Sequence, residues 1–165
     1  MAPPQGTARR RPVKRLLIVA HAPSPNTRAM LAAVRRGAEH PDVTDIQVSV
    51  RRAFDAGVDD VLAADGIILG TTENLAYMSG AMKDFFDRTY YGVIGRTEGL
   101  PYALYVRAGS DGTGTVKGVE RIVTGLRWNQ CQAPLVCKGQ YRTAFEAECE
   151  ELGLTIAAGL EAGIF

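Results

Sequence analysis

Cysteine and histidine are scarce in this sequence of 165 residues. The three cysteines stand at 131, 137 and 149, and the two histidines are His21 and His40. The cysteines form no Cys-x-x-Cys pair and have no histidine near them, which excludes a disulfide framework and a zinc site and predicts reduced thiols in a cytoplasmic protein. Neither histidine has a serine or cysteine partner suited to a hydrolase triad, so we assign no catalytic side chain and no metal ligand.

Long apolar runs and a strong net charge are missing as well. No run approaches the roughly 20 residues that span a bilayer, so the sequence predicts no membrane span. The net charge of +1 conceals a basic start: residues 1–15 carry five basic residues and no acid, which leaves 14 basic against 18 acidic residues, or −4. We therefore expect residues 1–13 to be a disordered basic leader, with a nucleic-acid-binding arm as the alternative, and residues 14–165 to form one domain. The acidic sign of that domain argues against a nucleic acid as its partner.

Apolar runs of strand length alternate with segments of helical periodicity along the whole domain. Residues 16–20 and 66–70 are apolar throughout and predict strands buried on both faces, whereas residues 46–50 alternate with period two and predict an edge strand. Because parallel neighbours need crossover helices, five such pairs predict an α/β fold, a doubly wound three-layer sandwich with a five-stranded parallel sheet in the order 2-1-3-4-5. The expected strands are 16–20, 46–50, 66–70, 102–106 and 134–137, and the expected helices are 27–38, 59–64, 79–90, 115–126 and 145–158.

The connection after the first strand, residues 21–27, is the first candidate ligand site, since ligands in such sheets bind beyond the carboxyl ends of the strands. It supplies Ser24, Asn26 and Thr27 together with the backbone N–H groups of a helix start, and it holds no lysine. Such neutral donors suit a permanently bound monophosphate. The alternative is that Ser24, Asn26 or Thr27 merely caps the helix.

The connection after the third strand, residues 71–80, mixes apolar and polar side chains and is long for a turn between a strand and a helix. A flat heterocycle would stack on Leu75 or Tyr77 while backbone groups meet its polar edge. Alternatively, Leu75, Tyr77 and Met78 form a hydrophobic staple over the next helix, which Ser79 caps.

The connection after the fourth strand, residues 107–114, is rich in glycine. The spacing of Gly109 and Gly114 is that of a P-loop, but Thr115-Val116 stands where Lys-Ser or Lys-Thr is required. These glycines either let the backbone approach a ligand closely or are ordinary turn residues. A ligand that has a phosphate and a flat ring, and that brings its own reactivity, fits all three connections.

Two stretches of the sequence resemble a family of flavoproteins. Residues 24–27, Ser-Pro-Asn-Thr, are similar to the phosphate loop of flavodoxin-like proteins, and residues 74–88, Asn-Leu-Ala-Tyr-Met-Ser-Gly-Ala-Met-Lys-Asp-Phe-Phe-Asp-Arg, are similar to their flavin-ring loop and the helix after it. Over residues 14–158 the chain resembles the FMN-binding NAD(P)H-dependent oxidoreductases of that family. The resemblance implies that the residues which bind the cofactor are His21, Ser24, Pro25, Asn26, Thr27, Thr71, Thr72, Glu73, Asn74, Leu75, Ala76, Tyr77, Arg107, Ala108, Gly109, Asp111 and Gly112.

The resemblance also implies an activity. NADH or NADPH would deliver a hydride to N5 of bound FMN, and the reduced flavin would then reduce a quinone, another flavin or another small electron acceptor. It further implies assembly with other copies of the chain. Thr72 stands where the family often has proline, and Glu73 brings a charge beside the expected ring, which we expect to lower the reduction potential of the flavin.

Two other functions remain open at this point. The first is an electron-transfer flavodoxin without NAD(P)H activity, although such carriers are usually far more acidic than the −4 found here. The second is a flavodoxin-like binding module that has no cofactor. An enzyme is favoured over a carrier by the modest charge.

Overall fold

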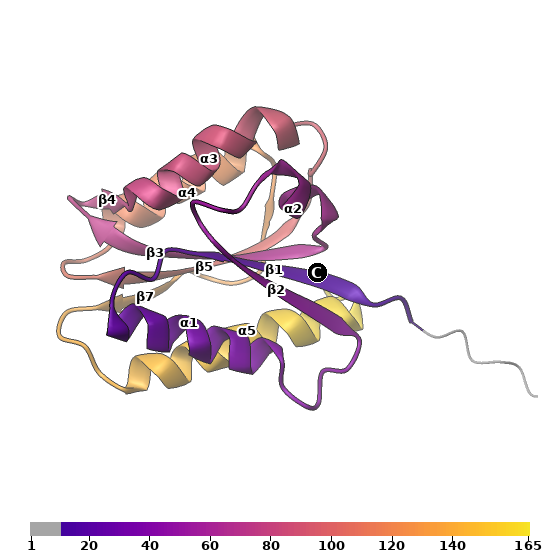
Figure 1. Ribbon diagram of the computed structural model, residues 1–165, viewed down its shortest axis with the longest axis horizontal. Helices are drawn as coiled ribbons and strands as arrows, with labels where there is room; N and C mark the ends of the chain where they lie inside the picture. The colour runs from indigo at the N-terminus through magenta and orange to yellow at the C-terminus, as the bar shows by residue number, and fades with distance from the viewer. Residues whose placement is uncertain (1–10) are drawn as a thin grey trace, which may run out of the picture.

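A parallel sheet lies between two layers of helices in the computed structural model, which describes residues 11–165 (Figure 1). β1 pairs in parallel with β2 and β3, β3 with β5, and β5 with both β6 and β7. The predicted order 2-1-3-4-5 is confirmed, with the fifth position shared by two short strands. The parallel strands are β1 (Lys14–Ala20), β2 (Ile46–Arg52), β3 (Gly66–Asn74), β5 (Pro101–Ala108), β6 (Asn129–Gln130) and β7 (Leu135–Lys138).

Helices cover both faces of the sheet, as a doubly wound fold requires. The helices α1 and α5 lie on one face, and α2, α3 and α4 lie on the other (Figure 1). Their bounds are α1 (Pro25–Ala38), α2 (Val58–Ala63), α3 (Gly80–Val93), α4 (Thr113–Gly125) and α5 (Ala144–Ala162).

Two hydrophobic cores, one on each face, hold the layers together. Phe85 and Phe86 of α3 are buried in one core, and Met30 of α1 and Phe145 of α5 are buried in the other. Burial of a side chain of this size stabilises the fold by roughly 1.5–3 kcal/mol relative to exposure. Residues 16–20 of β1 are at most 3% exposed, whereas β2 alternates between half-buried and exposed residues. The central place of β1 and the edge place of β2 are therefore confirmed.

The connection after β3 is a hairpin, so the prediction that residues 71–80 lie outside the strands is wrong for residues 71–74 and 77–78. β3 continues in register with β5, with Thr72 opposite Arg107, and β4 (Tyr77–Met78) then pairs back on it in antiparallel fashion. Threonine is β-branched and fits a strand. The two turn residues, Leu75 and Ala76, have φ angles of 51° and 61°. Because neither is the glycine or asparagine that usually marks such a turn, the sequence did not reveal it.

The remaining differences concern the ends of elements. The fifth strand is broken between β6 and β7 at residues 131–134, where Pro134 has no N–H to donate to the sheet. Helix α4 begins at Thr113 rather than 115, and α5 extends to Ala162 rather than 158.

The expected leader falls mainly on residues 1–10, which lie outside the described residues, and β1 begins at Lys14. Within residues 11–165, no helix combines the length and the apolar character that crossing a membrane requires.

Candidate functional site at the carboxyl edge

Three connections meet at the carboxyl edge of the sheet: residues 21–24 after β1, the hairpin of β3 and β4, and residues 109–112 after β5. Because β1, β3 and β5 are parallel neighbours, their carboxyl ends lie side by side. The backbone N–H of His21 donates to the carbonyl of Gly70 over 2.9 Å, which ties the first connection to β3. The structure thus brings the three predicted connections to one edge, and their role as cofactor ligands stays a prediction.

A reciprocal pair of hydrogen bonds between Ser24 and Thr27 closes the start of α1. The Thr27 N–H donates to Ser24 Oγ (3.2 Å), and the Ser24 N–H donates to Thr27 Oγ1 (2.9 Å). Ser24 and Thr27 therefore cap the helix, and a phosphate-binding role of the same turn stays a prediction. Pro25 has no N–H, and the backbone N–H of Asn26 has no partner within residues 11–165. This turn therefore offers a free amide beside two hydroxyl groups, with no acidic residue.

Phe54 lies at this edge and was not found from the sequence. It follows β2, it is 60% exposed, and its ring meets the ring of His21 edge to face with the centroids 6.4 Å apart. Burial lowers the pKa of His21, which keeps its imidazole neutral at neutral pH. The only signal in the sequence is a single aromatic residue two positions after the edge strand, which is too weak to indicate a site.

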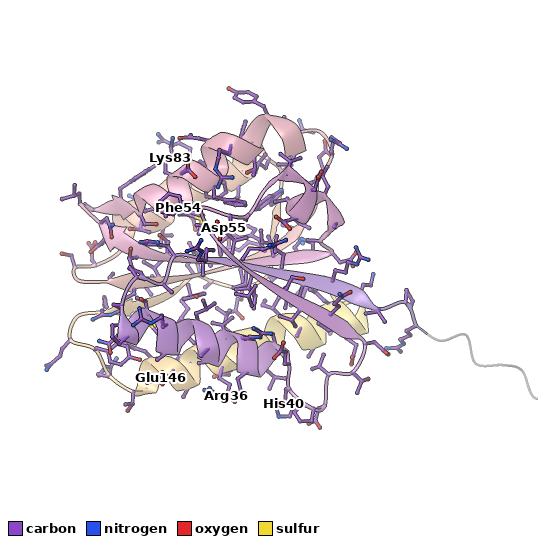
Figure 2. All side chains as sticks on the ribbon, viewed as in Figure 1. Arg36, His40, Phe54, Asp55, Lys83 and Glu146 are labelled. Carbon is purple, nitrogen blue, oxygen red and sulfur yellow. The ribbon has the colours of Figure 1, made fainter. Side chains whose placement is uncertain are left out.

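Arg88 holds the segment that presents Phe54. Its guanidinium donates to the carbonyls of Ala53 and Ala56, each over 2.8 Å, and Phe54 lies on the α3 side of the sheet (Figure 2). The arginine that ends the family-like stretch 74–88 therefore anchors the connection between β2 and α2 to helix α3.

Ser79 closes the start of α3. Its Oγ accepts the N–H of Met82 (3.1 Å), and its own N–H donates to Thr71 Oγ1 (3.1 Å). The predicted cap is confirmed. Leu75 does not pack over α3, because its side chain is fully exposed, so the staple alternative is wrong for this residue.

Glu73 joins the hairpin to the connection after β5. Its Oε1 accepts the N–H of Ser110 (2.8 Å) and its Oε2 accepts the N–H of Gly112 (2.7 Å). In the same connection, Asp111 Oδ1 accepts the N–H of Thr113 (3.0 Å), and this bond holds the pKa of Asp111 below its ordinary value. The carboxylate of Glu73 is thus held by two amides, and its effect on the potential of a flavin stays a prediction.

Arg107, which we expected to bind the cofactor, has a side chain that contacts other parts of the protein. Its guanidinium donates to the carbonyls of Ala108 (2.8 Å), Cys137 (3.0 Å) and Gly139 (2.7 Å). It also lies over the ring of Phe145, 5.5 Å from the centroid. The bonds to Cys137 and Gly139 tie β5 to the end of β7, so this side chain supports the fold, and its role as a cofactor ligand stays a prediction.

Comparisons with known proteins relate this chain to flavodoxins. No protein-family model matches the sequence. The chain is 28% identical over 112 residues to a flavodoxin of Aquifex aeolicus, and the matched stretch covers 68% of this chain and 60% of the length of that flavodoxin.

Solved structures share the fold. A flavodoxin from the domain Archaea matches with a TM-score of 0.71 and 21% identity, over 89% of this chain and 99% of its own. A WrbA-like flavodoxin from Agrobacterium tumefaciens matches with a TM-score of 0.67 and 15% identity, over 90% of this chain and 98% of its own. The predicted fold class is confirmed.

Proposed function

We propose that this chain, a flavodoxin-like protein in sequence and fold, binds FMN at the carboxyl edge of its sheet and passes electrons from NADH or NADPH to a quinone, a second flavin or another small acceptor. Bound FMN would supply the redox chemistry, because its ring accepts a hydride and gives up electrons. The observation that carries the proposal is the meeting of a helix start without acidic residues and an exposed apolar turn at one edge of a flavodoxin fold.

The start of α1 would bind the phosphate. The free amide of Asn26 lies at the positive end of the helix dipole, with the hydroxyls of Ser24 and Thr27 beside it. The absence of an acidic residue in this turn removes any repulsion of a dianion. A phosphate would therefore meet the neutral donors of Ser24, Asn26 and Thr27, with the exposed cation of Arg28 in the same turn.

The hairpin and the connection after β5 would bind the ring. Leu75 is fully exposed and offers an apolar surface to a flat heterocycle. A Cβ at Gly109 would have no atom within 4 Å, so the backbone there is open to the polar edge of a ring. Because two amides share the charge of Glu73, this edge does not present a bare carboxylate to a reduced flavin.

Exposed basic side chains surround the same edge and favour an enzyme over a carrier. Arg28 lies in the first turn of α1, Lys138 ends β7, and Arg142 precedes α5. None of the three has an ion-pair partner within residues 11–165. A nicotinamide dinucleotide is anionic, so these cations would attract it to the carboxyl edge of the sheet.

The visible spectrum of the purified protein tests the cofactor, before and after reconstitution with FMN. Anaerobic titration with NADH and then with NADPH tests the donor. We expect the protein to show flavin absorbance. NADH or NADPH should bleach this absorbance within the time of one catalytic turnover, and a quinone should restore it. Absence of flavin after reconstitution would overturn the proposal.

A carrier would give a different result in the same experiment. The similarity of the sequence to a flavodoxin supports this alternative. Its mark is a bound flavin that NADH and NADPH reduce slowly, while a partner redox protein exchanges electrons with it rapidly. A colourless protein that FMN does not stabilise against heat would indicate a binding module instead.

The proposal extends to compartment and assembly. We place the reaction in the cytoplasm, where the three cysteines, all free thiols, would stay reduced. We also expect more than one copy in the active form, which light scattering on the eluted protein would measure.

A further inference from the structure

The two sides of the proposed ring site are joined by one side chain. Glu73 leaves the end of β3, and its two carboxylate oxygens accept the amides of Ser110 and Gly112, at 2.8 and 2.7 Å, in the connection between β5 and α4. Bonds from backbone amides to a carboxylate are charge-assisted and stronger than neutral ones. The spacing between the hairpin and this connection is therefore set by Glu73.

The backbone N–H of Gly112, the capping residue of α4, donates to Glu73 and not to a side chain of its own helix. In α1, Thr27 at the third helical position accepts the N–H of the capping residue Ser24. Thr115 has the equivalent place in α4, but its Oγ1 is buried without a partner within residues 11–165, because the N–H of the capping residue Gly112 goes to Glu73. Gly112 is also held at a φ of 72°, which glycine alone adopts readily. The hydrogen bond between Gly112 and Glu73 thus takes the place of a capping box in α4.

The hairpin is seated against the same end of α4. A Cβ on Gly114 would collide with the carbonyl oxygen of Ala76, and a Cβ on Gly118, one turn later, would collide with the ring of Tyr77. This seat holds the turn in which Leu75 and Ala76 have positive φ angles, a conformation that costs energy for residues with a Cβ. The backbone of the hairpin fixes the position of Leu75, and Glu73 fixes the amides of Ser110 and Gly112 relative to Leu75.

We infer that Glu73 is a positioning residue for the flavin ring: its bridge to Ser110 and Gly112 forms the ring site before the flavin binds. The inference rests on the proposed FMN site. A preformed site binds more tightly because no free energy of binding is lost in ordering its loops. Loss of the bridge should therefore weaken binding of the flavin ring and leave binding of the phosphate unchanged.

The first test measures the bridge in the chain without flavin. Amide hydrogen exchange is compared in the wild type, Glu73→Ala, Glu73→Gln and the control Glu151→Ala, which removes an exposed glutamate of α5. We expect the Ser110 and Gly112 amides to exchange at least about tenfold faster in Glu73→Ala, since their acceptor is gone. Glu73→Gln keeps one acceptor oxygen and should lie between, and the control should match the wild type. Unchanged exchange at Ile18 of β1 shows that each variant is folded.

The second test measures affinity for FMN and for riboflavin, which has the ring and no phosphate, by quenching of flavin fluorescence. Glu73→Ala should weaken both by the same factor, about tenfold, because only the ring side is disturbed. Glu73→Gln should recover part of the loss.

Each other outcome overturns part of the argument. Unchanged exchange in Glu73→Ala means that the carboxylate does not hold the connection. Faster exchange with unchanged affinity means that the bridge serves only the fold, and tighter binding means that Glu73 competes with the ring. A wild type that binds neither flavin while the exchange contrast persists overturns the proposed FMN site, and with it the flavin role of Glu73, but leaves the bridge established.

Discussion

The ring of Phe54 lies edge to face against the ring of His21. The two residues follow β2 and β1, which are parallel neighbours, and their rings meet at an angle of 78°. On either side of Phe54, Ala53 and Ala56 are buried and their carbonyls are bound by Arg88, so the aromatic ring is exposed on a fixed segment. A neutral imidazole is thus maintained beside the helix start that we propose for the phosphate.

Replacing Phe54 by alanine should raise the pKa of His21 towards its ordinary value. Burial is the cause of the lowered pKa, because it disfavours the charged imidazolium, and the variant removes the covering ring. Titration of the His21 ring protons by NMR measures the change. Phe54→Leu, which keeps an apolar cover, should retain most of the depression, and an unchanged pKa in Phe54→Ala would contradict the shielding.

Gly37→Ala should destabilise the contact between α1 and α5. A Cβ at this position would collide with the carbonyl oxygen of Glu150, so the helices must separate, at a cost of about 1–3 kcal/mol in the free energy of unfolding. Urea denaturation measures this. Gly80→Ala at the start of α3 is the matched control: nothing lies within 4 Å of its Cβ, and we expect no loss. Equal stability of the two variants would contradict the close packing.

Arg88→Lys should release the segment that carries Phe54. Lysine has a single ammonium and cannot span the carbonyls of Ala53 and Ala56 as the forked guanidinium does, so we expect a loss of about 1–3 kcal/mol. Urea denaturation gives the loss, and limited proteolysis should show cleavage near Phe54. Lys83→Ala removes an ion pair with Asp87 on the same helix and should change stability by less than about 0.5 kcal/mol. Proteolysis as slow as in the wild type would count against the anchor.

Lys138→Ala and Arg142→Ala should raise the KM for the reduced dinucleotide about two- to tenfold and leave kcat unchanged, since these exposed cations would attract the anion without touching the reacting atoms. The difference from the wild type should shrink as salt is added. Arg121→Ala removes an exposed cation further along α4 and is the control. A KM that neither variant changes would remove the electrostatic support for an NAD(P)H-dependent enzyme.

The parts of the fold that depend on neighbours in the sequence were predictable. The apolar run 16–20 indicated a central strand, the alternation at 46–50 indicated an edge, and Ser79 indicated a helix start. The hairpin was not predictable, because the turn at Leu75 and Ala76 has no residue that favours positive φ and is held from outside by α4. Tertiary contacts override local preference at that point.

The sequence by itself determined that strands and helices alternate, which strands are central, and that three connections lie at one edge, because periodicity and apolar runs act over a few residues. Only the tertiary structure decided that Glu73 binds the amides of Ser110 and Gly112, that Arg107 is used to tie β5 to the end of β7, and that Phe54 covers His21. Each of these contacts joins residues far apart in the chain. The order of the strands brings them together, and no local pattern identifies the partner.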